Sequence, residues 1–563
     1  MTSRLTNYAT KTYLKFCVKT WPIITFGIII GLLFYSLPYG FWRGDDTAIL
    51  IHAIKSKGLS AFYDPNDWQN LSPSNLTPWV TLSFKIDLWL MGLSPKFFYI
   101  HQLCSLWIVA IASYLLNRLW LSPVWAFLCV CLFLVGAPTV TVTEQLMTRH
   151  YLEGMLFAFL SIIAFVYAIR QQQMKWAFIS ALAYAIAITA KEIYVPLILV
   201  VFLIPPVNSI KARLGLISPL VSIAILYVLW RHYMLGEMLG GYTDKSAILS
   251  FQSVVGMIEV AKNLPELFFG KTWQLPTILF CSTLAISFFK NIKIIPISII
   301  LIAGIIGPLI PLISFPGISS PNRYLFLFWY VACFAFITSI QFTTSLISKK
   351  KLVTYLIGIS LFLPVLISSV FHTKKITQLR HIIYQEFDVQ GRFFYTRGEK
   401  TGFIPTESLL NGYWYITSLC EIKELLKASC PEVIIKGVPL HNNIEELYAY
   451  DPKRMVMSNI SSNIGKEIKN IESINMTRTL YVSMFLENGW IHWDLGPYEN
   501  GQYYAASQKL GRYPISKKGH LKTSEKEISV YIQYESLDGW NTSSPLLITQ
   551  ENHPIIWKRP LLD

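Results

Sequence analysis

Charged residues are scarce in this sequence. Asp, Glu, Lys and Arg together make up 14% of the 563 residues, whereas a soluble globular domain carries roughly 25%. Hydrophobic residues make up 53%, and they are gathered in repeated uncharged runs of about 20 residues, the length that spans the hydrocarbon core of a bilayer. The composition therefore argues against a soluble protein and favours one polytopic membrane domain for most of the chain.

Acidic residues are fewer than basic ones, 33 against 48, so the formal net charge is +15. Such a balance can indicate a protein that binds nucleic acid. Here, however, Lys and Arg fall largely in short loops between the apolar runs, where membrane topology alone accounts for them. We therefore expect no nucleic-acid partner.

Cysteine is also scarce, with eight residues in the chain. No close cluster of His and Cys has the spacing of a zinc site, so we expect no structural metal. Cys420 and Cys430 fall in the region that we place outside the cytoplasm, where oxidising conditions favour a disulfide across a short loop. The other six lie in or beside apolar runs, where a buried thiol behaves as a small apolar side chain: Cys17, Cys104, Cys129, Cys131, Cys281 and Cys333.

The apolar runs predict about 11 membrane spans. The first run lacks a small-residue cleavage site, so we interpret it as a retained anchor helix with a cytoplasmic N-terminus. Each inward loop then carries Lys or Arg, as the positive-inside rule requires. The spans begin near Trp21, Phe97, Pro123, Gly154, Lys175, Glu192, Leu214, Pro276, Ile294, Tyr324 and Leu352.

An odd number of spans places the last part of the chain outside the cytoplasm. This part lacks long apolar runs and contains alternating segments such as 528–534, a helical stretch near 420–428, and the turn pairs Asn488-Gly489 and Asp538-Gly539. We therefore expect an all-α polytopic membrane domain over residues 1–371, with its first outer loop at 40–96. A mixed α/β, strand-rich extracytoplasmic domain follows over residues 372–563.

Acids, bases and His collect at the outward ends of the predicted spans, whereas the inward ends show almost only Lys and Arg. Charges at membrane depth are costly and need partners, water or a ligand. The mixed outward set therefore predicts a site on the non-cytoplasmic face. Its members are Asp45, Asp46, Glu144, Arg149, His150, Tyr151, Lys191, Glu192, Arg231, His232, Asn322, Arg323 and Tyr324.

Asp45 and Asp46 open a short predicted helix that lies along the membrane surface and stops at Gly58. One carboxylate can cap this helix. The other is then spare at the membrane boundary, where partial desolvation suits a general base. An Asp pair also suits Mg²⁺ or Mn²⁺, so a divalent cation on Asp45 and Asp46 stays open as an alternative.

Two segments place an Arg beside a Tyr at an outward helix end, Arg149-His150-Tyr151 and Asn322-Arg323-Tyr324. Arg stays charged and binds phosphate bidentately, so Arg149 and Arg323, with Lys191, can hold a lipid-linked phosphate at headgroup level. The alternative is that these residues only anchor the helices at the membrane border, where Tyr and Arg are common. His150 alone reads more often as a structural residue than as a ligand.

In this order, the residues resemble the GT-C superfamily of membrane glycosyltransferases, which includes protein mannosyltransferases and the aminoarabinose transferase of lipid A. Asp45-Asp46 resembles the family's acidic motif after the first span. The other similarities are the proline-led juxtamembrane helix and Gly-x-Ser turn at 76–94, Lys191-Glu192 at the fifth-to-sixth span junction, and the late Arg-Tyr signature at 322–325.

The resemblance implies that a hexosyl or pentosyl group moves, with inversion, from a polyprenyl-phosphate donor to a glycan, glycolipid or protein acceptor. It further implies a cell-envelope enzyme in a bacterial inner membrane, with the C-terminal domain in the periplasm. Asp45 would be the base, and Asp46 would orient it or cap the helix. The resemblance places the donor phosphate on Arg149, Lys191 and Arg323, with His150 and Tyr324 beside it.

The sequence departs from some family members. We find neither the proline-rich, His-containing continuation of the first loop nor the Trp-Trp-Asp signature of oligosaccharyltransferases, so transfer of a whole oligosaccharide to Asn is disfavoured. Two alternatives remain: a transporter or flippase for lipid-linked sugars, for which we expect mid-span charges and broken helices, and an O-antigen polymerase or ligase.

Overall fold

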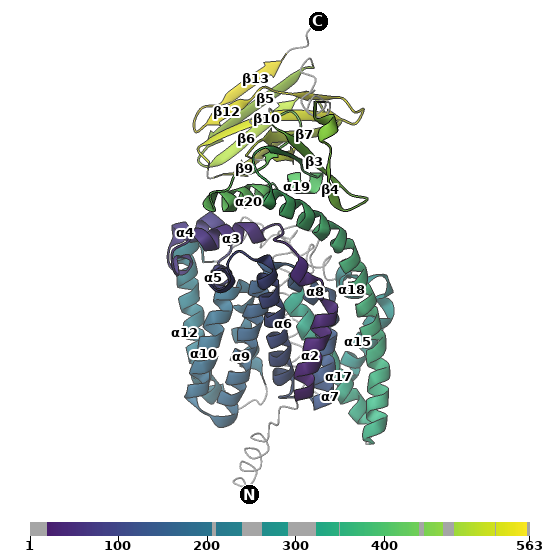
Figure 1. The fold of residues 1–563 in the computed structure, drawn as a ribbon. Coiled ribbons are helices and arrows are strands. Elements are labelled where there is room, and N and C mark those ends of the chain that lie inside the picture. The colour runs from purple at the N-terminus through teal and green to yellow at the C-terminus, as the bar shows by residue number, and fades with distance from the viewer. Residues whose placement is uncertain are drawn as a thin grey trace. The chain divides into compact units, whose positions relative to one another are not determined.

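The computed structural model divides the chain into two compact units (Figure 1). The helical unit contains residues 1–40 and 52–380, and the C-terminal unit contains residues 41–51 and 381–563. The segment 41–51, which carries Asp45 and Asp46, thus belongs with the C-terminal residues, whereas the sequence analysis placed it in the membrane domain. The structure describes residues 20–204, 210–238, 262–290, 323–347, 350–411, 413–438, 444–465, 478–509, 511–523 and 525–559.

The helical unit is built mainly from apolar helices. Two helices run on into the C-terminal unit, α3 (Asp46–Lys55) and α18 (Lys351–Thr396). The others are α2 (Thr20–Leu33), α4 (Pro65–Leu71), α5 (Trp79–Met91), α6 (Pro95–Asn117), α7 (Pro123–Val135), α8 (Ala137–Glu144), α9 (Arg149–Gln171), α10 (Met174–Ala190), α11 (Leu197–Leu203), α12 (Ile210–Leu235), α15 (Gln274–Lys290) and α17 (Phe326–Ile347).

Five helices in the described part of the chain are long and apolar enough to cross a membrane, or six if α7 and α8, which are bent by 58°, form one span. The protein is therefore an integral membrane protein, but the expectation of about 11 spans is not confirmed. Four shorter apolar helices cover other predicted spans, Trp21–Leu33, Met174–Ala190, Glu192–Phe202 and Gln274–Ser287. The span expected near Ile294 lies outside the described residues.

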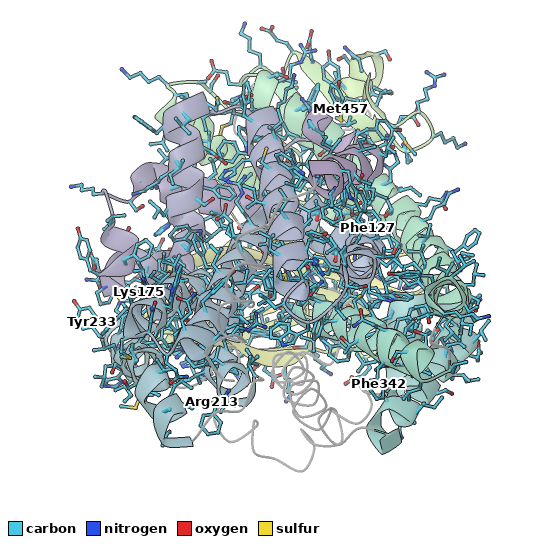
Figure 2. The ribbon with its side chains drawn as sticks, turned by 90° about the horizontal axis from the view of Figure 1, so that it is seen from below. Phe127, Lys175, Arg213, Tyr233, Phe342 and Met457 are labelled. Atoms are coloured by element: carbon cyan, nitrogen blue, oxygen red, sulfur yellow. A yellow bond between two sulfur atoms is a disulfide. The ribbon has the colours of Figure 1, made fainter. Side chains whose placement is uncertain are left out.

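Helices α9 and α10 are joined by a short connection and run in opposite directions. Only Gln172 and Gln173 separate α9 from α10, and these two helices pack along each other, with α6 against α9 and α12 against α10. Figure 2 shows Lys175, Arg213 and Tyr233 on the side of the unit that α10 and α12 form. The first residues of α9 and the last residues of α10 consequently meet at one end of the unit.

The C-terminal unit begins with a mixed sheet. Its strand order is β2-β1-β3-β4, in which β1 is parallel to β2 and β3, and β4 is antiparallel to β3. Two short helices, α19 (Glu407–Asn411) and α20 (Trp414–Leu425), follow β1. The strands are β1 (Thr401–Ile404), β2 (Glu432–Val433), β3 (Glu446–Asp451) and β4 (Val456–Asn459).

Two antiparallel sheets complete this unit, with orders β11-β10-β7-β8 and β13-β5-β6-β9, and β12 pairs the first half of β10. The predicted strand at 528–534 is confirmed as part of β10, and Asn488-Gly489 forms the β5–β6 turn with both φ values positive, as such turns require. The strands are β5 (Leu480–Glu487), β6 (Trp490–Gly496), β7 (Gly501–Ser507), β8 (Gly511–Ile515), β9 (Lys518–Lys522), β10 (Glu527–Ser536), β11 (Asn541–Ser543), β12 (Leu547–Gln550) and β13 (Ile555–Arg559).

The inward side chains of these two sheets form one apolar core. It contains Val482 and Leu495 from one sheet and Ile532 and Tyr534 from the other, all almost fully buried. Alternation along each strand places these residues on one face and polar residues on the opposite face. The strand-rich C-terminal domain expected from the sequence is therefore confirmed.

Candidate functional site

The acidic pair lies at the start of α3, as predicted, and its two carboxylates have different surroundings. Asp46 is fully buried, and its Oδ2 accepts a hydrogen bond of 2.9 Å from the backbone N–H of Arg43. Such a contact closes the turn that leads into the helix. Asp45 is half-buried, and its Oδ1 accepts a 3.0 Å hydrogen bond from the indole N–H of Trp414 in α20. Of the two, Asp45 is therefore the carboxylate with solvent access.

An ion pair that the sequence analysis missed holds this segment in the C-terminal unit. Arg43 donates from Nε and Nη2 to the two carboxylate oxygens of Asp388 in α18, at 2.8 and 2.7 Å. The backbone N–H of Phe41 also donates to Asp388, and the Tyr415 hydroxyl donates to the Trp42 carbonyl. A fork of this kind fixes both distance and orientation, which explains why residues 41–51 belong to the C-terminal unit.

Three of the predicted phosphate-binding residues lie together in the helical unit. His150 comes from the first turn of α9, Lys191 directly follows α10, and Arg323 precedes α17. The positive charges of Lys191 and Arg323 both act on the His150 ring, and Arg323 acts on Lys191. We call these three residues the cationic cluster, in which Lys191 and Arg323 carry the positive charge and His150 is the ring beside them. The short α9–α10 connection accounts for two of its members, because it returns the chain to the same end of the unit.

Two tyrosines line the cationic cluster. The Lys191 ammonium lies 5.1 Å from the centre of the Tyr151 ring. The Arg323 guanidinium lies 5.0 Å from the centre of the Tyr324 ring and donates to its hydroxyl at 3.0 Å. Contacts over ring faces hold cations without neutralising them, and Glu192, the next residue in the chain, also acts on the charge of Lys191.

His150 is 8% exposed, and its ring packs against Tyr151 with ring centres 4.8 Å apart. Among the described residues, neither ring nitrogen has a hydrogen-bond partner of ordinary geometry, although the Met147 backbone makes a looser hydrogen-bonding contact with the ring. Lys191 lies outside the helices that are long enough to span. Burial lowers its pKa to about 8, with Glu192 acting to raise it and Arg323 to lower it.

Arg149 lies apart from the cluster in its contacts, although it is the neighbour of His150 in the chain. Its guanidinium is completely buried and pairs with Asp87 of α5. It also donates to Ser83 and to the Phe98 carbonyl, at 3.3 and 2.7 Å. The N–H groups of Arg149, which we expected to bind the phosphate of the sugar donor, are thus hydrogen-bonded within the protein.

A second layer surrounds the Arg149–Asp87 pair. The His101 ring lies between two carboxylates, with Nδ1 2.6 Å from Asp87 and Nε2 3.4 Å from Glu153. Glu153 also accepts hydrogen bonds from the Trp79 indole and the Ser83 hydroxyl, at 2.6 and 2.9 Å. The sequence analysis missed Asp87, His101 and Glu153. The signal that marks Asp87 is the single carboxylate of a largely apolar helix whose other charged residue is Lys85.

Two other outward charges are paired within the helical unit. Glu192 accepts from Arg231 at 2.9 Å and from the backbone N–H of Leu76 at 3.0 Å, so it ties the first outer loop to α12. Glu144 lies 3.6 Å from Arg380. These contacts give Glu192, Arg231 and Glu144 a structural role. Asn322 lies outside the described residues.

The predicted disulfide is confirmed. Cys420 and Cys430 are joined, with 2.04 Å between the sulfur atoms. Together with Glu424, these two cysteines form the group of His, Cys, Asp or Glu side chains that lies at metal-ligand spacing in the described part of the chain. The sulfur atoms of a disulfide are not thiolates, however, and thiolates are the form of cysteine that binds a metal. Asp45 and Asp46 have no third such ligand beside them in that part of the chain, and the divalent cation stays a prediction.

The acidic pair belongs to the C-terminal unit and the cationic cluster to the helical unit. The acidic pair contains a partly exposed carboxylate, Asp45, and the cationic cluster contains two nearby positive charges, Lys191 and Arg323. Their convergence on one substrate is carried forward as a prediction.

No protein-family model and no curated protein matches the sequence. Among solved structures, the chain is similar to the oligosaccharyltransferase AglB of Archaeoglobus fulgidus in complex with an inhibitory peptide and a dolichol-phosphate, with TM-score 0.46, 9% identity, and coverage of 91% of this chain and 75% of that one. It is also similar to the apo form of the Archaeoglobus fulgidus oligosaccharyltransferase, with TM-score 0.41, 11% identity, and coverage of 71% and 64%.

A third similar structure is that of the Archaeoglobus fulgidus oligosaccharyltransferase in complex with Zn and sulfate, with TM-score 0.37, 10% identity, and coverage of 70% of this chain and 61% of that one. The chain thus spans less than two thirds of the length of the apo and zinc-bound structures. With TM-scores below 0.5, these similarities are too distant to carry an argument about function.

Proposed function

We propose that the protein is a GT-C-like inverting glycosyltransferase that moves a sugar from a polyprenyl-phosphate donor to an acceptor on the extracytoplasmic face of a membrane. The observation that carries the proposal is the cationic cluster of His150, Lys191 and Arg323 at one end of the helical unit. Lys and Arg are the side chains that bind phosphate groups, and Arg does so with several N–H donors. The phosphate of a membrane-embedded donor is an anion of the right kind.

The acceptor side of the reaction falls to Asp45. Its Oδ1 is held by the Trp414 N–H, which leaves Oδ2 to accept a proton from an acceptor hydroxyl. The acceptor oxygen then forms a bond to the anomeric carbon as the bond from that carbon to the phosphate oxygen breaks, which inverts the configuration. Asp46 is buried against the Arg43 backbone, so we assign it to holding the turn that presents Asp45.

The donor side falls to Lys191 and Arg323, which stabilise the charge that develops on the departing polyprenyl phosphate. His150 and Tyr324 complete the binding surface as a neighbouring ring and a hydroxyl. We assign Arg149 to positioning, because its pairing with Asp87 anchors the start of α9, from which His150 projects. Three parts of the proposal follow from the resemblance alone. They are the bacterial inner membrane, the class of acceptor and an assisting Mg²⁺ or Mn²⁺.

The test is transfer by purified protein from a polyprenyl-phosphate sugar. Asp45→Asn removes the base while keeping the hydrogen bond from Trp414, and we expect transfer to fall by at least about a hundredfold, as loss of a general base does. Asp64→Asn is the matched control, since Asp64 caps α4 and Asn caps equally well. Substantial turnover by Asp45→Asn would remove Asp45 from catalysis.

Two observations also fit one alternative function, a flippase for lipid-linked sugars. The α7–α8 pair is bent by 58°, and Asp87, Arg149 and Glu153 are buried charges within helices, both features of transporters. The two functions separate in sealed vesicles. A flippase moves the lipid-linked sugar across the bilayer without any acceptor, whereas the proposed transferase releases polyprenyl phosphate only when an acceptor is present.

A further inference from the structure

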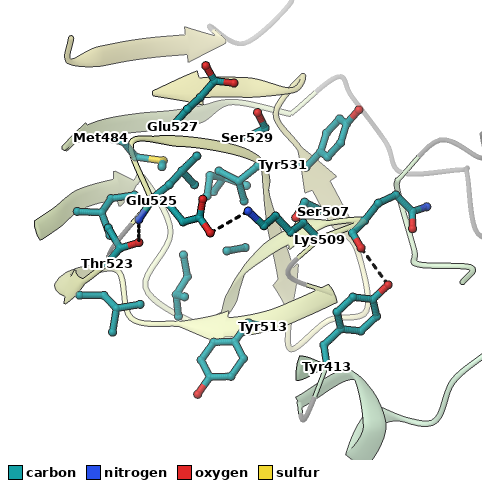
Figure 3. Close-up of a pocket in the computed structure, with 18 of the residues that line it drawn as sticks. Tyr413, Met484, Ser507, Lys509, Tyr513, Thr523, Glu525, Glu527, Ser529 and Tyr531 are labelled. Atoms are coloured by element: carbon teal, nitrogen blue, oxygen red, sulfur yellow. Dashed lines mark hydrogen bonds and ion pairs between the residues drawn. The ribbon is translucent and has the colours of Figure 1, made fainter. Parts of the chain in front are cut away.

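The C-terminal unit contains a cavity of about 720 Å³ between its two antiparallel sheets (Figure 3). Ligand-binding pockets have volumes of about 300 to 1,000 Å³. The sheets are linked on one side by β12, which pairs β10, and by the next residue, Glu551, which bridges to Leu486 of β5. On the other side β8 and β9 are edge strands of different sheets joined by a short turn. The sheets therefore enclose a space that their core residues do not fill.

Aliphatic and aromatic side chains make most of the lining of this cavity, and polar side chains make the rest. Met484 and Ile491 line it from one sheet, and Ile515 and Val530 from the other. Lys509 and Glu525, which form an exposed ion pair at 2.8 Å, also line it (Figure 3). A mainly apolar lining with charged groups at an exposed border suits a ligand that is apolar along most of its length and polar at one end.

This chemistry distinguishes a hydrocarbon chain from a sugar or a peptide. Sugar hydroxyls and peptide N–H and C=O groups must find hydrogen-bond partners when they leave water, and each unsatisfied group costs free energy. The aliphatic and aromatic side chains that make most of the lining offer few such partners. A hydrocarbon chain needs none, and its burial is favourable in proportion to its area.

One residue of the lining also contacts the candidate base. Trp414 lines the cavity and donates its indole N–H to Asp45, and the neighbouring Tyr413 lines the cavity and donates to the Gln508 carbonyl at 3.0 Å. All of these residues belong to the C-terminal unit. A chain bound in the cavity therefore lies against the side chain that orients Asp45.

We propose that this cavity binds the hydrocarbon chain of the acceptor, so that the acceptor is a lipid-linked molecule. The inference rests on the proposed function, because Asp45 takes its proton from the acceptor and not from the donor. The cavity holds the chain, and Trp414 places the polar end of the acceptor near Asp45. A chain of the same chemistry also occurs in the polyprenyl donor, and the experiment separates the two sources.

The experiment uses the full chain in lipid nanodiscs with a long-chain fatty acid that carries a photoactivatable diazirine, followed by mapping of the crosslinked peptides. We expect crosslinks in β6, β8 and β9. Ala505→Phe fills the cavity, and we expect it to reduce these crosslinks about tenfold, since burial of a few methylene groups is worth that factor. Crosslinks confined to the helical unit would overturn the proposal.

Leu521→Gln is a second variant at a side chain that lines the cavity and is 61% exposed, so the test remains decisive if Ala505→Phe does not fold. The matched control is Ile548→Phe, at an exposed position of β12 that is not part of the lining, and it should leave the crosslinks unchanged. Equal crosslinking in both cavity variants and the control would contradict the proposal.

Competition identifies the source of the chain. Unlabelled polyprenyl phosphate should leave the C-terminal crosslinks in place, whereas displacement by it would assign the cavity to the donor and overturn the acceptor assignment. Asp45→Asn separates this inference from the proposed function. Crosslinks in the cavity together with full transfer by Asp45→Asn would refute the transferase mechanism, and loss of transfer without crosslinks would refute the acceptor site.

Discussion

Two groups of cationic residues adjoin at the start of α9, and they differ in how their charge is compensated. Arg149 is completely buried against Asp87, and this pair belongs to a network with His101 and Glu153. His150, the next residue, lies instead among the like charges of Lys191 and Arg323. The comparison teaches that burial and positive charge alone do not mark a ligand site. A compensated cation supports the fold, whereas a group of cations that act on one another is suited to an anion.

We expect the greatest loss of stability when the Arg149–Asp87 pair is broken. Arg149→Met leaves Asp87 buried without its partner, and loss of one member of a buried pair costs about 3 to 5 kcal/mol of stability. We expect a clear fall in the melting temperature of the purified protein, and partial recovery in the double variant Arg149→Met/Asp87→Leu. A normal melting temperature together with a higher KM for the donor would return Arg149 to the phosphate site and abolish the contrast.

The next effect concerns the cationic cluster. Lys191→Met and Arg323→Met each remove one charged donor, worth about 1.5 to 3 kcal/mol at the phosphate, so kcat/KM for the polyprenyl-phosphate sugar should fall about tenfold to a hundredfold. Stability should hold, because each change also relieves like-charge repulsion. Lys175→Gln is the matched control, since Lys175 lies at the opposite end of α10 from Lys191. An equal loss in that control would show that the effect is not local.

The titration of Lys191 should have a smaller effect, which appears in the pH dependence of donor use. Burial lowers the pKa of Lys191 to about 8, aided by Arg323 and opposed by Glu192, so the folded protein binds fewer protons than the unfolded chain between about pH 8 and pH 10.5. Stability from this group therefore rises across that window, while donor binding weakens as Lys191 loses its charge. We expect kcat/KM for the donor to fall above about pH 8.

Lys191→Arg supplies the control for this pH profile, because Arg stays protonated in proteins. The variant should keep donor use at higher pH even where its absolute rate is lower. An unshifted profile in Lys191→Arg would assign the titration to another group and leave Lys191 outside the phosphate site.

Local pattern predicted the parts of this molecule that depend on neighbours in the chain. The α3 start at Asp46, the β5–β6 turn at Asn488-Gly489 and the strand over 528–534 follow from residue type and periodicity. The Cys420–Cys430 disulfide follows from a short separation and the expected compartment. The gathering of His150 and Lys191 follows from one helical hairpin.

Contacts between segments that are distant in the chain could not be predicted from local patterns. Arg43 and Asp388 are far apart in the chain, and nothing local in either segment identifies the other as its partner. Arg149 has the composition of a phosphate ligand, and only packing of α5 against α9 shows that Asp87 compensates it. The cavity in the C-terminal unit depends on how two sheets diverge, and the alternation of a strand does not report that distance.

The central claim is that the cationic cluster holds the phosphate of the donor. The most direct measurement is a structure of the full chain with bound polyprenyl phosphate. We expect phosphate density in contact with Lys191 and Arg323 and beside His150, while Arg149 keeps its ion pair with Asp87. Phosphate density bound by Arg149 with the Asp87 pair broken, or density far from Lys191 and Arg323, would contradict it.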